Sequence, residues 1–419
     1  MSGGVLTQRR RGAERGVATR ALLNGRFDRI SCAQRKPLWS VTIWDKKFNS
    51  VATGKQTTAI KYHYLLAGDL KEKIVPGGDV KLLTTSETDW WTTEDKVSGL
   101  VSEGEIVSIP WGGNPNVQYF KGRFVTADNR IATSSDKTVL DNKFLYYFML
   151  AKRNTIGSFY RGAGLKHPEM AKVLDMEIPL PSIDVQRSFV YCMDNVTKVI
   201  AARKTQLESL SQLVKSRFVE MFGDYDASAK KVTLGDICDL VTVGIANSAT
   251  HAYADKGVVM FRNQNIHENK LDETDLIYIK EDFAAKYEAK TLREKDLLVT
   301  RTGYPGVACL VPSKYEGAQT FTTLIARLAD FKKSNPVFVC HYINSAYGKR
   351  FVEKNKVGIA QQNFGAKALA ELPIFLPPIA LQREFATFVG KVDKLAFAVR
   401  KSLESAEKLY RQQLSEAFS

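Results

Sequence analysis

Arginine and amide side chains that could bind nucleic-acid bases gather in one short polar segment. The sequence FRNQNIHENK places Arg262, Asn263, Gln264 and Asn265 in succession. Arginine and carboxamide groups form paired hydrogen bonds with the edges of guanine and adenine in the major groove of DNA. The segment is therefore the best candidate for base reading, and the alternative is an ordinary polar turn that follows a strand. The nearby His267 could contact a phosphate or simply face solvent.

Loops that contain glycine or proline carry further candidates for contacts with nucleic acid. The turn RTGYPG holds Arg301 and Tyr304 where the backbone can approach a phosphate and the ring can pack on a sugar or a base. The loop GIAQQNFGAK and several segments of the first half of the chain add amide, cationic and indole side chains. These further candidates are Gln361, Gln362, Asn363, Lys367, Trp111, Asn114, Asn116, Arg123, Lys152, Arg153, Arg161 and Lys166. The pair Trp90 and Trp91 is interpreted as core rather than as a stacking platform.

A net positive charge favours a polyanionic partner. The chain of 419 residues holds 60 Lys and Arg against 45 Asp and Glu, which gives a net charge of +15 and a pI near 9.4. Cationic side chains bind nucleic acid by neutralising phosphates and releasing counterions. Charge alone is equally compatible with an ordinary basic protein. Residues 1–36 contribute +7 of the charge with little apolar sequence, which predicts a poorly ordered basic tail.

Residues that could act as catalysts are sparse. The segment Asn114–Val117 reads NPNV, which lacks the second proline and the aromatic residue of the Asn-Pro-Pro-Tyr signature of adenine methyltransferases. Asp79 with Glu94, Asp95 and Lys96 could hold a metal ion for a nuclease, but such groupings arise easily in a chain that is 25% charged. The sequence contains no Walker A motif, no CxxC pair and no HExxH. We therefore expect neither catalytic residues nor a metal site in this chain.

A repeated string organises the elements that must position the candidate residues. IPLPSIDVQRSF at Ile178–Phe189 returns as IFLPPIALQREF at Ile374–Phe385 after a shift of 196 positions, with seven of twelve residues identical. The prolines cannot continue a helix, so each copy predicts an extended connector. A long pattern without proline follows each copy, from Gln186 to Phe222 and from Gln382 to the C-terminus. These patterns predict two helices of roughly 55 Å each.

Apolar residues recur every seven positions in both predicted helices, with others interleaved, and the register is the same after the shift of 196. This pattern predicts that the two helices pack on each other. The predicted seam residues are Phe189, Met193, Val196, Ile200, Leu207, Leu210, Val214, Phe385, Val389, Val392, Val399 and Leu403. Arg203 and Arg217 also fall in the seam, so the packing cannot be uniform. The alternative is two unrelated surface helices whose stripes face their own domains.

The repeat also predicts the domain organisation. Residues 37–178 and 224–372 would form two similar domains of ordinary size. Residues 179–223 and 373–419 would each form a connector and a long helix. Strands and helices are mixed without regular βαβ alternation, so we expect an α+β fold with a pseudo-twofold internal repeat. No apolar run is long enough to span a membrane, and the scattered cysteines fit a reducing, cytoplasmic setting.

The two connectors, Leu180–Phe189 and Leu376–Phe385, each lead from a variable domain into a long helix. With this architecture the chain resembles the specificity subunit of type I restriction-modification enzymes over residues 37–419. The resemblance implies that each domain is a target recognition domain that reads one half of a bipartite, gapped DNA site. It also implies that the helices form an antiparallel coiled-coil pair that acts as a spacer and sets the gap.

The resemblance further implies partners for this chain. Modification (methyltransferase) subunits would dock on the helices, and motor-nuclease restriction subunits would join the assembly. The specificity subunit itself is then non-catalytic, and S-adenosylmethionine, ATP and magnesium belong to the partner subunits. Two other classes of function stay open: a helical bridging protein without sequence-specific DNA binding, and a metal-dependent nuclease.

Overall fold

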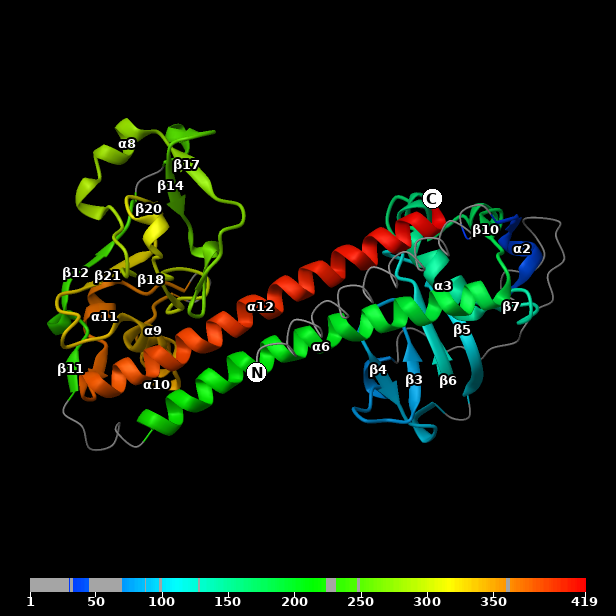
Figure 1. The fold of residues 1–419 in the computed structure, drawn as a ribbon, viewed down its shortest axis with the longest axis horizontal. Helices are drawn as coiled ribbons and strands as arrows, with labels where there is room; N and C mark the ends of the chain where they lie inside the picture. Colours follow the sequence, from blue (N-terminus) through cyan, green and yellow to red (C-terminus); the bar gives the residue numbers. More distant parts are fainter. Residues whose placement is uncertain are drawn as a thin grey trace, which may run out of the picture. The chain divides into compact units, whose positions relative to one another are not determined.

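The computed structural model contains two compact units, one formed by Met1–Arg203 with Lys401–Ser419 and the other by Lys204–Arg400 (Figure 1). We call them unit 1 and unit 2. The structure describes residues 30, 33–44, 70–86, 88–97, 100–126, 129–223, 231–246, 249–358 and 362–419. Strands and helices are mixed in both units, which confirms the predicted α+β class. No helix among these residues is long and apolar enough to cross a membrane.

Two helices of 40 residues, α6 (Ile183–Phe222) and α12 (Ile379–Phe418), each contribute to both units. Both begin three residues before the predicted starts at Gln186 and Gln382. Proline is compatible with the position just before or at the start of a helix, because the first N–H groups have no partner within the helix. Pro378 therefore stands directly before α12, and Pro181 is separated from α6 by Ser182 alone.

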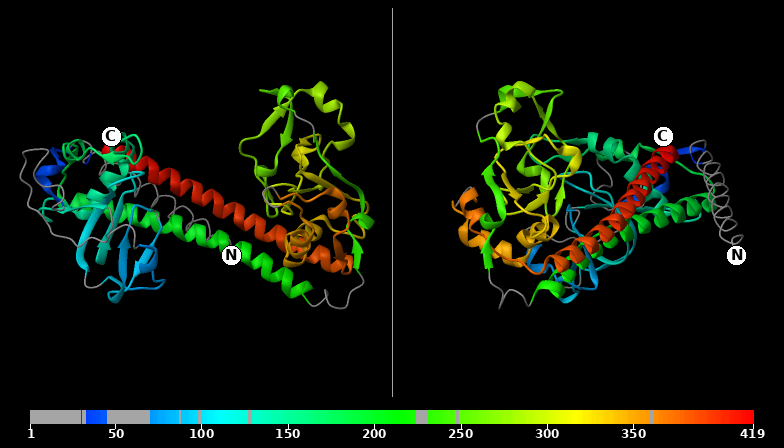
Figure 2. Two further views of the ribbon diagram at one scale, coloured as in Figure 1. Left: turned by 180° about the vertical axis from the view of Figure 1, so that it is seen from behind. Right: turned by 60° about the vertical axis from the view of Figure 1, so that its left-hand side comes forward.

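Unit 1 is built on a mixed sheet of six strands in the order β2-β7-β5-β6-β3-β4, in which only β3 and β6 are parallel neighbours. The strands are β2 (Thr42–Trp44), β3 (Val80–Leu83), β4 (Trp90–Thr92), β5 (Ser102–Pro110), β6 (Gln118–Thr126) and β7 (Asn129–Ser134). Shorter strands are β1 (Arg35–Pro37), β8 (Tyr160–Arg161), β9 (His167–Pro168) and β10 (Glu177–Pro179). The helices are α2 (Leu38–Val41), α3 (Asn142–Ala151), α4 (Arg153–Ser158) and α5 (Met170–Leu174). Figure 2 shows this sheet with α3 against it.

The predicted basic tail, residues 1–36, is described only at its end. Residues 1–29, 31 and 32 lie outside the described residues, and Ile30 is buried in the core of unit 1. Arg35 and Lys36 belong to β1, which pairs antiparallel with β10. Strand β1 therefore begins before the predicted start of the first domain at residue 37.

The main core of unit 1 packs α3 against the sheet and against both long helices. Asp141 caps α3, because its side chain accepts hydrogen bonds from the backbone N–H groups of Lys143 at 2.8 Å and Phe144 at 3.1 Å. The ring of Phe144 then lies 5.7 Å from that of Phe189 in α6 and 5.2 Å from that of Phe418 in α12. The first turns of α6 and the last turn of α12 are thus part of the core of unit 1.

Unit 2 contains two sheets of four strands. One has the order β12-β21-β18-β19 and the other has the order β13-β17-β14-β20. Their strands are β12 (Cys238–Val243), β13 (Tyr253–Ala254), β14 (Val258–Phe261), β17 (Ile277–Ile279), β18 (Leu297–Val299), β19 (Ala308–Leu310), β20 (Gln319–Thr320) and β21 (Leu324–Leu328). Two strand pairs are separate: β11 (Lys231–Thr233) with β22 (Pro373–Phe375), and β15 (Ile266–His267) with β16 (Lys270–Leu271). The short helices are α8 (Glu281–Ala285), α9 (Pro336–Asn344), α10 (Ala346–Asn355) and α11 (Ala366–Ala370).

The core of unit 2 follows the same plan as that of unit 1. Asn335 caps α9 in the way that Asp141 caps α3. Phe338 of α9 then packs on Phe222 of α6, with ring centroids 4.9 Å apart. Phe385 of α12 lies 5.4 Å from Phe218 of α6 between ring centroids. The last turns of α6 and the first turns of α12 are therefore part of this second core.

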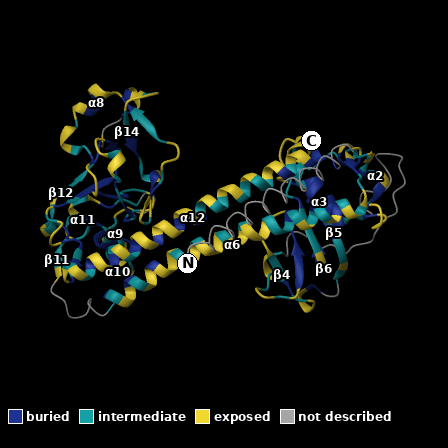
Figure 3. Ribbon diagram, viewed as in Figure 1, coloured by how far each residue is buried: buried dark blue, intermediate teal, exposed yellow. Residues whose placement is uncertain are grey.

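Within each unit the segments of α6 and α12 pack on each other, which confirms the predicted pairing of the two helices. In Figure 3 exposed turns alternate with buried or intermediate ones along both helices. Every predicted seam residue is buried or half-buried: Phe189, Met193, Val196, Ile200, Leu207, Leu210, Val214, Phe385, Val389, Val392, Val399 and Leu403. The two arginines of the seam bond across it, Arg203 Nε to Ser402 Oγ at 3.2 Å and Arg217 to Glu384 at 3.1 Å. The apolar stripes also contact the cores of their own domains. Because the helices pack on each other, they are not the two unrelated surface helices of the alternative.

One buried glutamine in each unit joins the domain to its long helix. Gln186 Oε1 accepts from the backbone N–H of Asp141, and its Nε2 donates to the carbonyls of Val139 and Pro181. Gln382 does the same with the N–H of Asn335 and two carbonyls. Both side chains are fully buried. The repeated glutamine of the two strings thus holds the loop before α3 or α9 onto the start of the long helix.

We expect Gln186→Ala to lower the free energy of unfolding of unit 1 by about 2–4 kcal/mol, because one N–H and two carbonyl groups lose their buried partner. The loss can be measured by urea titration followed by tryptophan fluorescence, since all five tryptophans lie in unit 1. Gln412→Ala is the matched control, because Gln412 is an exposed glutamine of α12 whose side chain bonds only Glu416. Equal losses in the two variants would contradict the anchoring role of Gln186.

Candidate nucleic-acid interface

Three turns of unit 2 that are distant in sequence meet at one place. The first is the 3-10 turn η7 (Asn263–Asn265), the second follows β18, and the third precedes α11. Asn263 joins the first two, because its Nδ2 donates to Thr302 Oγ1 at 2.8 Å and its Oδ1 accepts from the N–H of Arg301 at 3.3 Å. Arg301 joins the second and third, because its Nε donates to Asn363 Oδ1 at 3.1 Å. The structure therefore brings three separately predicted segments into one polar cluster.

Backbone hydrogen bonds fix the second turn against the third. The N–H of Phe364 donates to the carbonyl of Arg301 at 2.9 Å, and Thr302 and Asn363 form an antiparallel bridge. The main chain of Arg301 is thus held on both sides. A side chain that projects from such a support needs little further ordering when it binds a ligand.

Tyr304 lies at the tip of the second turn and is 88% exposed. Gly303 and Gly306 flank it with φ angles of 78° and 88°, a left-handed backbone that favours glycine. A Cβ on Gly306 would also come within 2.6 Å of the side chain of Val352. A large aromatic ring held on a tight turn and left in solvent is suited to packing on a sugar or a base.

Other residues of the predicted base-reading segment are already engaged within the protein. Arg262 Nη2 donates to the carbonyl of Asp275 at 2.6 Å and to its carboxylate at 2.9 Å, and Gln264 Nε2 donates to the same carboxylate at 2.9 Å. Asn265 is 1% exposed, and its Nδ2 donates to two backbone carbonyls. We therefore regard Asn265 as a residue that shapes the turn and leave it out of the proposed interface.

The remaining candidates of unit 2 differ in their exposure and in their contacts. Gln362 Oε1 accepts from Lys356 Nζ at 3.0 Å, so this amide is partly engaged. Lys367 is exposed on α11. Gln361 lies outside the described residues.

In unit 1 the equivalent loops also meet. The N–H of Gly113, after β5, donates to the carbonyl of Lys166 at 3.3 Å, in the loop between β8 and β9. Arg153 Nε donates to the carbonyl of Pro115 at 2.9 Å. Gly113 after β5 and Gly303 after β18 both have a left-handed backbone, with φ angles of 87° and 78°. The position two residues before this glycine is Trp111 in unit 1 and Arg301 in unit 2.

A cationic side chain that the sequence analysis did not select, that of Arg130, packs on the ring of Trp111. The guanidinium carbon of Arg130, in β7, lies 3.8 Å from the centroid of the Trp111 ring. His167 packs on the same ring, with centroids 5.1 Å apart. An arginine on an indole face is a favourable cation–π contact. No local pattern identifies Arg130, because Trp111 follows β5 and Arg130 lies in β7, and these two strands are neighbours only in the folded sheet.

The other candidates of unit 1 differ in their availability. Asn114 and Lys166 are exposed. Asn116 Nδ2 donates to a backbone carbonyl at 3.2 Å, and Arg161 forms an ion pair at 3.2 Å with a nearby glutamate. Lys152 caps the end of α3, and burial lowers the pKa of its ammonium group. Asn114 and Lys166 therefore have the most freedom to contact a ligand.

Arg123 lies in β6 and forms ion pairs with Asp79 and Glu94, at 2.6 Å in the case of Asp79. These two carboxylates are the ones that the nuclease alternative would use to hold a metal ion. A metal ion would have to displace the guanidinium group from both of them. The described residues contain no cluster of three or more metal-ligating side chains. The geometry thus favours a structural ion-pair network over a metal site.

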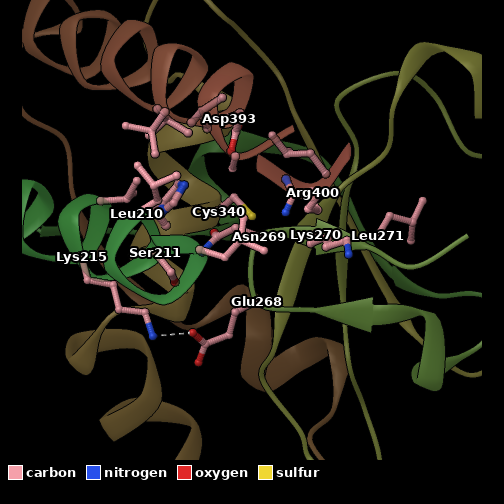
Figure 4. Close-up of a pocket in the computed structure, with 18 of the residues that line it drawn as sticks. Leu210, Ser211, Lys215, Glu268, Asn269, Lys270, Leu271, Cys340, Asp393 and Arg400 are labelled. Carbon is pink, nitrogen blue, oxygen red and sulfur yellow. Dashed lines mark ion pairs between the residues drawn. The ribbon is translucent and has the colours of Figure 1, made fainter. Parts of the chain in front are cut away.

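A pocket of about 490 Å³ lies in unit 2 between the helix segments and the β15–β16 hairpin (Figure 4). Leu210 and Val389 contribute apolar surface, and Glu268 of the hairpin lies at its rim. Glu268 pairs with Lys215 of α6 at 3.0 Å and with Lys349 of α10. Burial raises the pKa of Glu268, but the two ammonium groups outweigh it and hold the pKa below its usual value. The hairpin that follows η7 is therefore tied to the long helix.

The chain is similar to proteins of known class. Residues 33–212 and 228–406 match the type I restriction modification DNA specificity domain. The type I restriction enzyme MjaVIII specificity subunit of Methanocaldococcus jannaschii is 21% identical over 327 residues, 74% of this chain and 77% of that protein. The type I restriction enzyme EcoBI specificity subunit of Escherichia coli is 21% identical over 346 residues, 76% of this chain and 70% of that protein.

Solved structures share the fold. The crystal structure of the type I restriction-modification S subunit from M. genitalium has a TM-score of 0.60 at 14% identity, over 92% of this chain and 96% of that one. A chain from a study of complex assembly and conformational transition of the type I system has a TM-score of 0.52 at 15% identity, over 92% of this chain and 97% of that one.

We expect Asn263→Ala to loosen the turn after β18, because it removes the bonds to Arg301 and Thr302. Loss of a hydrogen bond of about 1 kcal/mol corresponds to roughly fivefold faster amide exchange of Arg301, measurable by hydrogen exchange. Gln264→Ala, which removes only the contact with Asp275, is the control from the same turn and should leave this exchange rate unchanged. Unchanged exchange in Asn263→Ala would show that this asparagine does not support the turn.

Proposed function

The chain belongs to the family of the type I restriction modification DNA specificity domain, and from this premise we propose that its two units read the two halves of one gapped DNA sequence. It is the non-catalytic specificity subunit of such a system and carries two copies of the domain. Modification and restriction subunits would supply the catalysis, with S-adenosylmethionine, ATP and magnesium bound to them. We expect the complex to act in the cytoplasm.

The convergence of two loops in each unit is the main support for this proposal. Each unit brings the turn after its central strand together with the loop that precedes its connector, at Gly113 with Lys166 and at Thr302 with Asn363. Arginine, amide and aromatic side chains of the predicted segments surround both meeting points. These groups can bond base edges, bind phosphates and stack on bases. A bridging protein would have no need for such a cluster in each unit.

The two clusters share their backbone plan and differ in chemistry. At the matching position unit 1 has Trp111, whose ring packs on the buried Arg130, whereas unit 2 has Arg301 held by Asn363. Different side chains on one scaffold are what two different half-sites require. We therefore propose that the half-sites read by the two units are unlike each other.

The proposed spacer consists of α6 and α12. A helix of 40 residues is about 60 Å long, and stiff elements hold a spacing that a flexible linker would blur. We propose that the length of the paired helices sets the number of base pairs between the half-sites.

A groove on the helices of unit 1 is the proposed docking surface for a modification subunit. It has a volume of about 760 Å³ and is lined by Tyr191, Val199 and Leu409 among others. Tyr191 is 72% exposed and Val199 is 43% exposed. Large apolar side chains that cluster in solvent are typical of protein interfaces.

Mapping of methylated adenines in cells with and without this gene tests the function directly. We expect one bipartite sequence with a fixed gap to lose its methylation when the gene is removed. Binding of the complex with its modification subunit should also favour that sequence by at least about a thousandfold over random duplex at physiological salt. Equal affinity for all duplexes would support the bridging alternative instead.

Insertion of one heptad into both helices, after Arg203 and after Arg400, tests the spacer. Seven residues add about 10.5 Å, so we expect the gap to widen by up to about three base pairs while both half-sites stay the same. The same seven residues inserted after Gly223, beyond the end of α6, are the control and should leave the gap unchanged. An unchanged gap in the variant with the longer helices would contradict the proposal that the helices set the gap.

A further inference from the structure

We propose that Arg301 is a specificity-determining residue that reads a guanine in the half-site of unit 2, and that Asn363 is the residue that positions it. This inference rests on the proposed function and deepens it, because it names the base and the side chain. Among the arginines of unit 2, Arg301 is held in place by an amide side chain.

The guanidinium group of Arg301 is bonded through one of its three nitrogen atoms. Its Nε donates to Asn363 Oδ1 at 3.1 Å, while its backbone N–H and carbonyl bond Asn263 and Phe364. Within the described part of the chain, the two Nη groups of Arg301 have no hydrogen-bond acceptor. The side chain is half-buried, so its stem is supported by neighbouring groups. Two Nη groups on a side chain that Asn363 holds at Nε are therefore left to bond a ligand.

The charge of Arg301 distinguishes it from the other arginines nearby. Arg262 is neutralised by Asp275, and Arg327 is neutralised by the buried carboxylate of Asp296. The side-chain partner of Arg301 is the neutral amide of Asn363, and no carboxylate of the described residues pairs with it. An arginine held by an amide keeps its full charge for a ligand, whereas one held by a carboxylate does not.

Two Nη groups acting together select guanine among the bases. In the major groove guanine presents two acceptors, O6 and N7, to such a pair. Adenine presents one acceptor and one donor, so one of the two N–H groups would face an N–H group of the base. Cytosine and thymine offer no such pair of acceptors. A pair of N–H groups with a fixed direction therefore discriminates between bases, and a flexible cation would not.

A phosphate is the competing ligand, because it also accepts two hydrogen bonds from arginine. The fixed direction of Arg301 favours the base, since phosphate binding tolerates a mobile side chain and gains little from the support of Asn363 and Asn263. The ring of Tyr304, three residues further along the same turn, is exposed to solvent. It is therefore a better candidate than Arg301 for a contact with the sugar-phosphate backbone.

The test uses the full-length chain in complex with its modification subunit and compares four variants with the wild type. Arg301→Gln removes the charge and the paired donors, and Arg301→Lys keeps the charge but not the pair. Asn363→Ala removes the positioning bond. Arg293→Gln removes an exposed arginine that precedes β18, at the other end of the strand from Arg301, and is the matched control.

Each complex is assayed by its methylated motif in cells and by its affinity for a randomised DNA library at several salt concentrations. We expect Arg301→Gln and Arg301→Lys to lose roughly tenfold or more of the preference for guanine at one position of one half-site. Asn363→Ala should lose part of the same preference at the same position. The other half-site should be unchanged in all variants, which shows that the chain remains folded, and Arg293→Gln should leave both half-sites unchanged.

Two results would overturn the assignment of Arg301. A loss of affinity for all sequences alike in Arg301→Gln, largely restored in Arg301→Lys, would identify a phosphate contact. Unchanged motifs in both Arg301 variants would show that Arg301 does not read DNA. Either result leaves the proposed function intact, because the wild type still recognises a gapped site. Failure of the proposed function would be different, since the wild-type complex itself would then show no sequence preference.

Discussion

The structure depends on a buried carboxamide at the start of each long helix. Each glutamine, Gln186 and Gln382, bonds one N–H and one carbonyl of the loop before α3 or α9. Its other N–H donates to a proline carbonyl of the connector, that of Pro181 or Pro377. A buried polar group that loses its partner costs about 1–3 kcal/mol, so each anchor can be filled only by a side chain with this combination of groups. The domain and its helix are therefore fixed to each other by the same interaction in both units.

Each long helix is as much a part of a domain core as it is a partner of the other helix. Phe189 contacts Phe144 of its own domain and Phe418 of α12, and Phe385 contacts Phe218 of α6 and His341 of α9. Removing apolar area from water drives both contacts at once. The heptad stripe thus serves two surfaces, while its two irregular positions, Arg203 and Arg217, bond polar groups of α12.

The proposed DNA interface combines a constant support with variable side chains. Gly113 and Gly303 adopt the same left-handed backbone two residues after Trp111 and Arg301. In both units main-chain bonds join the turn to the neighbouring loop, and these bonds do not involve the side chain of Trp111 or Arg301, so that residue can change while they are kept. Two domains with the same fold can read different DNA sequences only if the backbone keeps its conformation while the side chains change.

The sequence by itself determined the two-domain plan, the positions of the long helices within three residues and their pairing, because repeats and heptads are properties of the local chain. It also selected the polar segments of unit 2 that the fold then brings together. Only the tertiary structure decided which of those residues are available: Arg262 and Arg301 look alike in sequence, yet Asp275 neutralises the first and Asn363 merely orients the second. The contact of the buried Arg130 with Trp111 was missed for the same physical reason, since the partner of a side chain comes from a distant segment that only folding brings near.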